Sequence, residues 1–165
     1  MRTDNSPAVF ARVVRICRSA FAALSFYRLA DAARDRYRTR HATREQAHGR
    51  RGEDLAHRFL RRHGLIIVAR NFHPRSGSSE LDLVAWDQLT LVFVEVKTRA
   101  SADFGNPGRA VGNEKQRDLR RAAGEYLRRS GVARERARFD LVNIILAKPP
   151  QIEWIKNAFP VSRTL

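Results

Sequence analysis

Residues 80–99 carry the side chains whose types and spacing are best suited to chemistry. The segment is typical of two strands joined by a tight turn at Asp87-Gln88, which makes them antiparallel. Alternate residues of a strand share a face, so Glu95 and Lys97 point the same way, and the turn places Asp82 opposite Glu95 to within a couple of positions. Two carboxylates and an ammonium group are therefore expected on one surface of a sheet.

This arrangement predicts a divalent-cation site. Converging carboxylates repel each other unless a cation lies between them, and oxygen ligands with waters suit Mg²⁺ or Mn²⁺. The backbone carbonyl of Val96 is a candidate third ligand, and Lys97 can orient or deprotonate a metal-bound water or stabilise charge on a phosphate. The alternative is a cross-strand salt bridge on a solvated face, worth roughly 0.2–1 kcal/mol. Asp82, on the preceding strand, favours the metal site.

Other side chains are candidates for the same site. Glu53 lies at helical spacing on the inward face of its helix, where it can reach the cation or hold the attacking water; equally, it is an acid near a helix N-terminus. Lys115 and Gln116 begin the apolar stripe of a second helix and can contact a phosphate, although capping explains Gln116 as well. Arg99, at the end of the second strand, is a further candidate nucleic-acid contact.

An α/β domain, residues 47–165, is expected to position these residues. Its predicted elements are a helix that begins near Gly52 and ends at Gly64, strands over residues 65–69, 80–86 and 90–98, a second helix with Asn113 as N-cap and Gly131 as its end, and strands over residues 139–146 and 152–155. Strand 90–98 is apolar on both faces, as in the centre of a covered sheet. The second helix is expected to have a solvent-exposed face of arginines, namely Arg117, Arg120, Arg121, Arg128 and Arg129.

Residues 1–46 read as a separate basic extension, partly helical or disordered. Apolar residues between Phe10 and Leu24 recur at helical spacing with arginines among them. Such a helix can lie on a membrane, on nucleic acid or on its own domain, and the segment is also compatible with upstream sequence included by a misplaced start. No apolar run approaches the roughly 20 residues of a spanning helix.

The amino-acid composition limits the classes of partner that the protein is expected to bind. The 165 residues hold 32 Lys and Arg against 17 Asp and Glu, a net charge of +15, while 43% are hydrophobic, enough for one core. A polyanionic partner is expected, nucleic acid first and an anionic membrane second. Cys17 is the single cysteine, which excludes an intramolecular disulfide and a cysteine-rich zinc site and fits a reducing compartment such as the cytoplasm.

The order and spacing of several sequence blocks resemble the YraN family of small bacterial proteins. The blocks are GEDLAHRFL from Gly52, ARNF from Ala69, ELDLVAWD from Glu80, LVFVEVKTR from Leu91, EKQRDLRRAAGEYL from Glu114, FDLVNI from Phe139 and IEWIKNAF from Ile152. That family is similar to the restriction-endonuclease-like PD-(D/E)xK superfamily, particularly archaeal Holliday junction resolvases. The resemblance implies a central mixed sheet flanked by helices.

The resemblance also assigns residues. Asp82 matches the first acid, Glu95 and Lys97 match the (D/E)xK positions, and Glu53 matches the acid on the first helix of resolvases. It implies a Mg²⁺-dependent endonuclease that acts on DNA rather than RNA, on branched or structured DNA by analogy, with a homodimer as one option. The alternative is a non-catalytic nucleic-acid-binding module with this fold. The chain departs from the pattern where Ser78-Ser79 separates Gly77 from Glu80, and where Leu81 replaces the proline.

Overall fold

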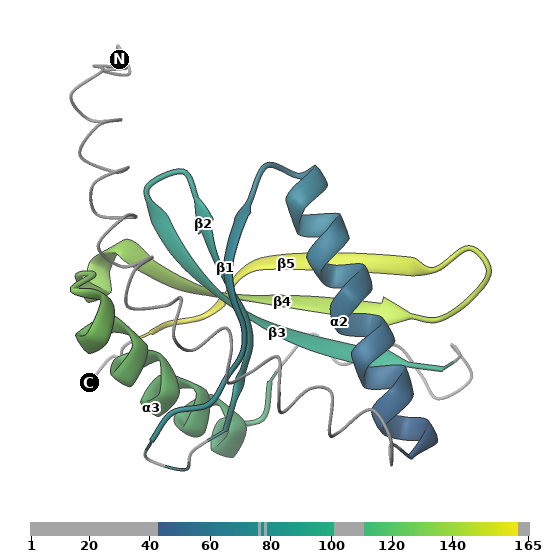
Figure 1. The fold of residues 1–165 in the computed structure, drawn as a ribbon, viewed down its shortest axis with the longest axis horizontal. Helices are drawn as coiled ribbons and strands as arrows, with labels where there is room; N and C mark the ends of the chain where they lie inside the picture. Colours follow the sequence, from purple (N-terminus) through teal and green to yellow (C-terminus); the bar gives the residue numbers. More distant parts are fainter. Residues whose placement is uncertain (1–42, 76, 78, 101–110, 162–165) are drawn as a thin grey trace. The chain divides into compact units, whose positions relative to one another are not determined.

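The fold is built around one five-stranded mixed β-sheet (Figure 1). A computed structural model describes residues 43–75, 77, 79–100 and 111–161. Its elements are α2 (Arg44–Arg62), β1 (Ile66–Phe72), β2 (Leu81–Asp87), β3 (Thr90–Arg99), α3 (Asn113–Ser130), a short 3₁₀ helix η2 (Arg134–Arg136), β4 (Ala137–Ile145) and β5 (Gln151–Phe159). The strands lie in chain order, and β3 and β4 form the one parallel pair among these five. The expected α/β class is confirmed, and the arrangement is compatible with a restriction-endonuclease-like fold.

Helix α2 covers one face of the sheet. Its apolar stripe recurs at helical spacing through Ala56 and Leu60, which are fully buried. These side chains belong to one core cluster with alternate residues of the strands, namely Leu83, Ala85, Val92, Val94, Val142 and Ile144. The even-numbered side chains of β3 therefore point toward α2, and its odd-numbered side chains point to the opposite face.

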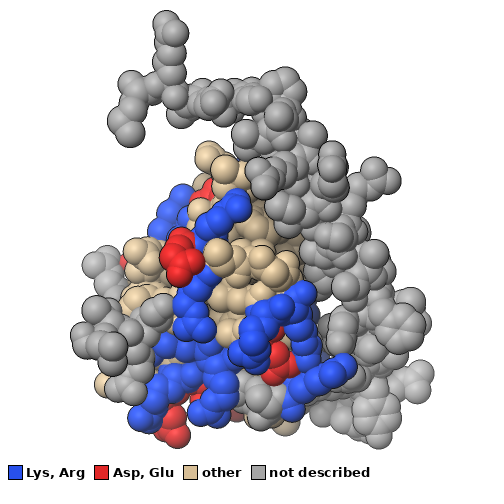
Figure 2. Space-filling view, turned by 90° about the vertical axis from the view of Figure 1, so that its left-hand side faces the viewer, with Lys and Arg blue, Asp and Glu red and all other residues tan. Residues whose placement is uncertain are grey.

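Helix α3 contributes apolar residues to that opposite face. Leu119, Ala122 and Ala123 are buried, and the ring of Tyr126 meets Phe93 of β3 edge-on with centroids 5.8 Å apart. The outer side of α3 is basic: Lys and Arg side chains dominate the lower part of the surface in Figure 2, where α3 lies in Figure 1. Glu95 and Lys97, as odd-numbered residues of β3, are thus on the face of the sheet that α3 packs against.

Two predicted helix starts were wrong. Helix α2 begins at Arg44 rather than near Gly52, because Thr43 and Gln46 form a reciprocal capping box, with Thr43 Oγ1 accepting from the Gln46 N–H and Gln46 Oε1 from the Thr43 N–H. Gln46, the last residue of the predicted extension, therefore lies within α2. The N-cap of α3 is Gly112 rather than Asn113, since the Gln116 side chain donates to the Val111 carbonyl instead of bonding back to Asn113.

The strands are in the predicted places, but two are longer than expected. β1 continues through Arg70 and Asn71 to Phe72, and β5 continues through Lys156 and Asn157 to Phe159. Arg70 and Phe72 pair with β2, and Phe159 pairs with β4, so the strands extend past their polar residues. Asn157 lies at an irregularity in the β4–β5 register, where its N–H donates to Asp140 Oδ1 at 2.9 Å. The predicted end of α3 is confirmed, because Gly131 adopts the left-handed conformation with φ 66°.

Part of the sequence lies outside this description. The predicted helix between Phe10 and Leu24 falls on residues that the structure does not describe, and so does most of the segment between the predicted strand 90–98 and the second helix. In the part that it does describe, none of the helices is both long and apolar enough to cross a membrane.

Candidate metal and phosphate site

Asp82 and Glu95 meet where β2 and β3 separate. Leu83 pairs with Val94, so the next antiparallel pair sets Asp82 opposite Glu95, and beyond this point the strands diverge (Figure 1). Asp82 Oδ2 accepts a hydrogen bond of 2.7 Å from the backbone N–H of Val96. The side chain thus bonds the neighbouring strand where the backbone ladder stops, and the predicted pairing of two carboxylates on one face is present in the structure.

The two carboxylates make each other more difficult to ionise. Burial raises the pKa of Asp82 well above its usual range, and the nearby carboxylates of Glu95 and Glu53 raise it further. Burial also raises the pKa of Glu95, while the ammonium group of Lys115 opposes that rise. Glu95 Oε2 is buried and has no hydrogen-bond partner among the described residues. A buried carboxylate oxygen without a donor is a position that a cation or an ordered water can satisfy.

Glu53 approaches the same site from α2. Its side chain is 18% exposed, and its Oε2 lies 4.0 Å from Arg70 Nη2 with no hydrogen-bond partner among the described residues. The Asn71 side chain hydrogen-bonds to the Glu53 carboxylate and lowers its pKa. Burial raises the pKa of Glu53, and the Asn71 hydrogen bond only partly offsets this. Asn71 has φ 49°, a left-handed conformation that Asn tolerates better than most residues. The inward placement expected for Glu53 is therefore present, and Asn71 is a partner that the sequence analysis missed.

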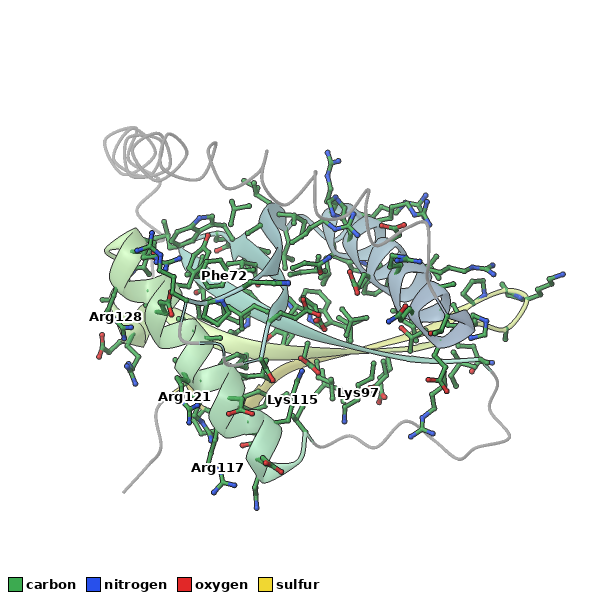
Figure 3. All side chains as sticks on the ribbon, turned by 60° about the horizontal axis from the view of Figure 1, so that its bottom comes forward. Phe72, Lys97, Lys115, Arg117, Arg121 and Arg128 are labelled. Carbon is green, nitrogen blue, oxygen red and sulfur yellow. The ribbon has the colours of Figure 1, made fainter. Side chains whose placement is uncertain are left out.

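Lys115 extends from the first turn of α3 to the carboxylates. Its Nζ lies 3.3 Å from Glu95 Oε1, and its side chain is 38% exposed. Figure 3 shows Lys115 and Lys97 close together beside the sheet, and both ammonium groups act on the pKa of Glu95. Lys115 was expected to contact a phosphate; here it forms an ion pair with a site carboxylate, from a position where it remains open to solvent.

Two other predicted phosphate contacts lie in different surroundings. Arg99 is exposed and lines the cavity described below. Gln116 is held within α3, since its amide donates to Val111 and its Oε1 accepts from Arg120 Nη2 at 2.7 Å. The structure therefore brings Asp82, Glu95 and Lys115 into one group with Arg99 at its border, and it uses Gln116 to fasten the start of α3.

A cavity of about 490 Å³ connects the acids. Its wall includes Glu53, Asp82, Glu95, Val96 and Arg99, and also Glu45, His48 and Thr98. The last three were not predicted as site residues. Glu45 and His48 belong to the first turns of α2, which precede the predicted helix start near Gly52, so they were not expected at the site. The Thr43-x-x-Gln46 capping box was the signal that could have found them.

Gly52 fixes the distance between α2 and the site. A Cβ at this position would overlap the Thr98 side chain, with the Thr98 Cβ and Cγ2 atoms at 2.8 and 2.9 Å. The backbone of α2 therefore crosses β3 at a distance that only glycine allows. Because Glu53 is the next residue, this close approach determines how far its carboxylate extends toward Asp82.

The donor set suits a magnesium ion that keeps several waters. Among the described residues, no three His, Cys, Asp or Glu side chains form a ready-made metal cluster. Mg²⁺ does not require one, because it is commonly bound through one or two carboxylates with water completing an octahedron. The N–H and C=O of one strand residue point to the same side, so the Val96 carbonyl is directed toward the strand edge where its N–H meets Asp82. The paired carboxylates and the unpartnered Glu95 oxygen fit such an ion.

The chain is similar to one group of bacterial proteins. A profile described as the uncharacterised protein family UPF0102 matches residues 52–144. A UPF0102 protein of Solibacter usitatus is 50% identical over 133 residues, which cover 81% of this chain and 96% of that protein. One of Koribacter versatilis is 47% identical over 115 residues (69% and 80%), and one of Desulfosudis oleivorans 45% over 114 residues (69% and 90%). Residues 52–144, which the family profile matches, include Glu53, Asp82, Glu95, Arg99 and Lys115 but not Glu45 and His48.

Proposed function

This chain belongs to the UPF0102 family, which its motifs identified as the YraN family, and we propose that it is a metal-dependent endonuclease that hydrolyses phosphodiester bonds in DNA. The observation that carries the proposal is the meeting of Asp82 and Glu95, two carboxylates with raised pKa values, in a cavity that also holds Glu53. Burying like charges together is unfavourable unless a ligand offsets the repulsion, so strongly perturbed acids in a cavity are typical of a functional site.

Mg²⁺ or Mn²⁺ is the cofactor of this proposal. Asp82 and Glu95, with the backbone carbonyl of Val96, would hold the ion, which supplies Lewis-acid stabilisation of phosphate charge and a more acidic bound water. The donors are all oxygens, as these cations prefer.

The remaining residues would move protons and offset charge. In hydrolysis a water oxygen forms a bond to phosphorus, the bond from phosphorus to one sugar oxygen breaks, and that oxygen takes up a proton. Glu53, whose pKa is raised by burial, is suited to hold the attacking water and accept its proton. Lys97 and Lys115 lie where positive charge can stabilise the developing negative charge on the phosphate oxygens.

DNA is proposed as the substrate because the net charge of +15 favours a polyanion. Branched or otherwise structured DNA, a homodimer and a location in the bacterial cytoplasm extend this proposal by analogy with junction resolvases. A dimer suits a four-way junction, which presents two equivalent strands.

Cleavage of defined substrates tests the proposal. The full chain would be incubated with labelled duplex, single-stranded, flap and four-way-junction DNA, and with matched RNA, in Mg²⁺, Mn²⁺ or EDTA. We expect cleavage in Mg²⁺ or Mn²⁺ that stops in EDTA and is abolished by Asp82→Asn and by Lys97→Ala. Lys156→Ala, which removes an exposed lysine beside Trp154, is the matched control and should cut normally. Equal cutting by wild type and Asp82→Asn would show a contaminating nuclease and overturn the proposal.

A non-catalytic nucleic-acid-binding module is the second candidate. It is favoured by the Lys115–Glu95 ion pair, which already offsets part of the negative charge without a metal. The two candidates share the expectation that DNA affinity falls steeply with salt. They differ in metal dependence, since the binding module would hold DNA equally well in EDTA and cleave none of the substrates in any cation.

A further inference from the structure

One side of α3 presents a straight line of arginines to solvent. Arg117, Arg121 and Arg128, hereafter the α3 arginine stripe, are four and seven residues apart, so at 3.6 residues per turn they lie on one stripe of the helix. All three are exposed, and Figure 3 shows them pointing away from the sheet; Arg121 Nη1 also lies 3.7 Å from Asp118 Oδ1 of the same helix. The two other arginines predicted for this solvent-exposed face are engaged in the fold: Arg120 donates to the Pro160 carbonyl, and Arg129 pairs with Glu125 and lies over the Phe72 ring.

Two guanidinium groups converge at the far end of this stripe. A Cβ built on Gly124 would lie 3.7 Å from Arg128 Nη1 and 3.8 Å from Arg134 Nη2, so both groups lie over the same point of the helix. Within the described parts of the chain, no ion pair joins Arg128 or Arg134 to a carboxylate. Like charges held together without an acid form a site that an anion with several acceptor oxygens can satisfy. A phosphate group has that geometry, and Arg binds it with two parallel hydrogen bonds.

The stripe begins in the same helical turn as Lys115, but on the other side of α3. Lys115, which contacts Glu95, lies two residues before Arg117, and two residues turn the helix by about 200°. At a rise of 1.5 Å per residue, Arg117 and Arg128 are separated by about 16 Å along the axis. This length corresponds to about five steps of one DNA strand at roughly 3.4 Å each. DNA bound at the carboxylate site would therefore have to pass the first turn of α3 for the flanking duplex to place its phosphates against these arginines.

The chemistry of the stripe favours nucleic acid over a membrane. A helix that binds a membrane surface inserts an apolar face beside its basic one. The apolar residues of α3, including Leu119, Tyr126 and Leu127, are buried in the core. In the described residues, the exposed large hydrophobic side chains are Ile66 and Leu89, neither of which belongs to α3. The surface therefore offers charge and hydrogen bonds without a group that could enter a lipid layer.

We propose that the α3 arginine stripe, together with Arg134, binds the phosphate backbone of the duplex that flanks the bond cut at the carboxylate site. The identity of the polyanion rests on the proposed function. The contacts involve phosphates alone, so they increase affinity for any sequence and set the length of duplex that the protein requires.

The test compares two triple variants of the same charge. Arg117, Arg121 and Arg128 are replaced by Ala in one, and Arg51, Arg58 and Arg62, exposed on α2 at the same spacings in reverse order, are replaced in the other. Binding to a 20-base-pair duplex is measured in EDTA between 50 and 200 mM salt, on an Asp82→Asn background. The slope of log K against log [salt] should be smaller in magnitude by about 2.7 in a variant that has lost three phosphate contacts than in the parent protein. We expect this loss for the α3 variant and a near-normal slope for the α2 variant.

Equal losses in the two variants would mean that binding follows overall charge, and would overturn the proposal. Absence of binding by the parent protein would do the same. Arg134→Ala should reduce the slope by about 0.9, as expected for one contact, and an unchanged slope would remove Arg134 from the surface. Cleavage is assayed separately with Asp82 intact. If the protein never cleaves DNA but the α3 variant loses binding, the binding surface is supported and the nuclease is rejected. If the protein cleaves DNA and the α3 variant binds normally, the nuclease is supported and the binding surface is rejected.

Discussion

Lys115 Nζ lies 3.3 Å from Glu95 Oε1, so the charge of this buried glutamate is partly offset by a residue from a different layer of the fold. The pair is asymmetric, because Glu95 is buried whereas Lys115 is 38% exposed. An ammonium group on a long, partly exposed side chain can leave the carboxylate at little cost. A metal ion and Lys115 are therefore expected to compete for Glu95, and Lys115 would be released toward the phosphate.

Replacing Lys115 by Ala tests this competition. Removing the cation should strengthen Mg²⁺ binding by about 1.4- to 5-fold, which corresponds to the 0.2–1 kcal/mol of a partly exposed ion pair. It should weaken DNA binding in the same protein, because a phosphate contact is lost. Calorimetric titration with Mg²⁺, followed by DNA titration, measures both. Weaker Mg²⁺ binding by Lys115→Ala would show that the lysine supports the metal rather than competing with it.

Asp82→Asn should stabilise the metal-free protein. The raised pKa of Asp82 means that its ionised form is disfavoured in the folded state. Asn keeps an oxygen that can accept the Val96 N–H, so the free energy of unfolding at pH 7 should increase. Urea denaturation in EDTA measures this. Mg²⁺ should then stabilise wild type and not the variant, since ligands that bind the folded state shift unfolding.

The same shifts predict how stability depends on pH. The pKa values of Asp82 and Glu95 are raised above their ordinary values of 3.8 and 4.5, so the folded protein holds these protons at pH values where the unfolded chain has lost them. Their favourable contribution is complete below those ordinary values and is lost as the pH rises through the raised ones. In EDTA, the stability difference between Asp82→Asn and wild type should accordingly widen from about pH 4 upward. A stability difference that stays constant across this pH range would contradict the raised pKa of Asp82.

Gly52→Ala should damage the protein although Ala is the better helix former. The added Cβ would overlap the Thr98 side chain and push α2 away from β3, at a cost of about 1–3 kcal/mol, as for other overpacked sites. Cleavage should fall as well, because Glu53 moves with the helix. Gly49→Ala is the control: a Cβ there has no atom within 4 Å, so the helix should gain up to about 1 kcal/mol. The midpoint of thermal unfolding is measured for both variants. Equal shifts in the two midpoints would contradict the close approach of α2 to Thr98.

Glu53 and its neighbour Asp54 form a matched pair of acids on α2. Glu53 lines the cavity, whereas Asp54 is 53% exposed and pairs with Arg70 at 2.6 Å. Glu53→Gln should lower the rate constant for cleavage by about 10²- to 10⁴-fold, the usual effect of losing a proton acceptor, with DNA affinity retained. Asp54→Asn should cut at nearly the wild-type rate. Single-turnover assays across pH distinguish the roles, because only a proton acceptor changes the acidic limb of the pH profile.

The carboxylate pair was predictable because its geometry is local. Asp82 and Glu95 lie on adjacent strands joined by a two-residue turn, and such a short connection fixes the register. The turn is Gln88-Leu89 rather than the predicted Asp87-Gln88, because Asp87 pairs with Thr90 in the ladder. Leu91 to Val94, apolar on both faces, correctly indicated that this strand is central in the sheet. Local patterns of this kind depend on residues that are close in sequence, and the sequence displays them directly.

The rest of the site depends on contacts between distant parts of the chain. Lys115 meets Glu95 only because α3 packs on the odd-numbered face of β3, and no periodicity specifies that contact. Asn71 reaches Glu53 through a left-handed backbone conformation that the sequence does not announce. His48 was missed because the helix was predicted to begin near Gly52, whereas α2 begins at Arg44.

The strands lie in the sheet in the order in which they occur in the chain, and this has a consequence for folding. The β1–β2–β3 meander closes through short loops, so it can form early, whereas the parallel β3–β4 pair waits for the longer crossover that contains α3. Asp82 and Glu95 would therefore come together before Lys115 arrives. Until α3 packs on the sheet, the repulsion between the two acids lacks the offsetting charge of Lys115.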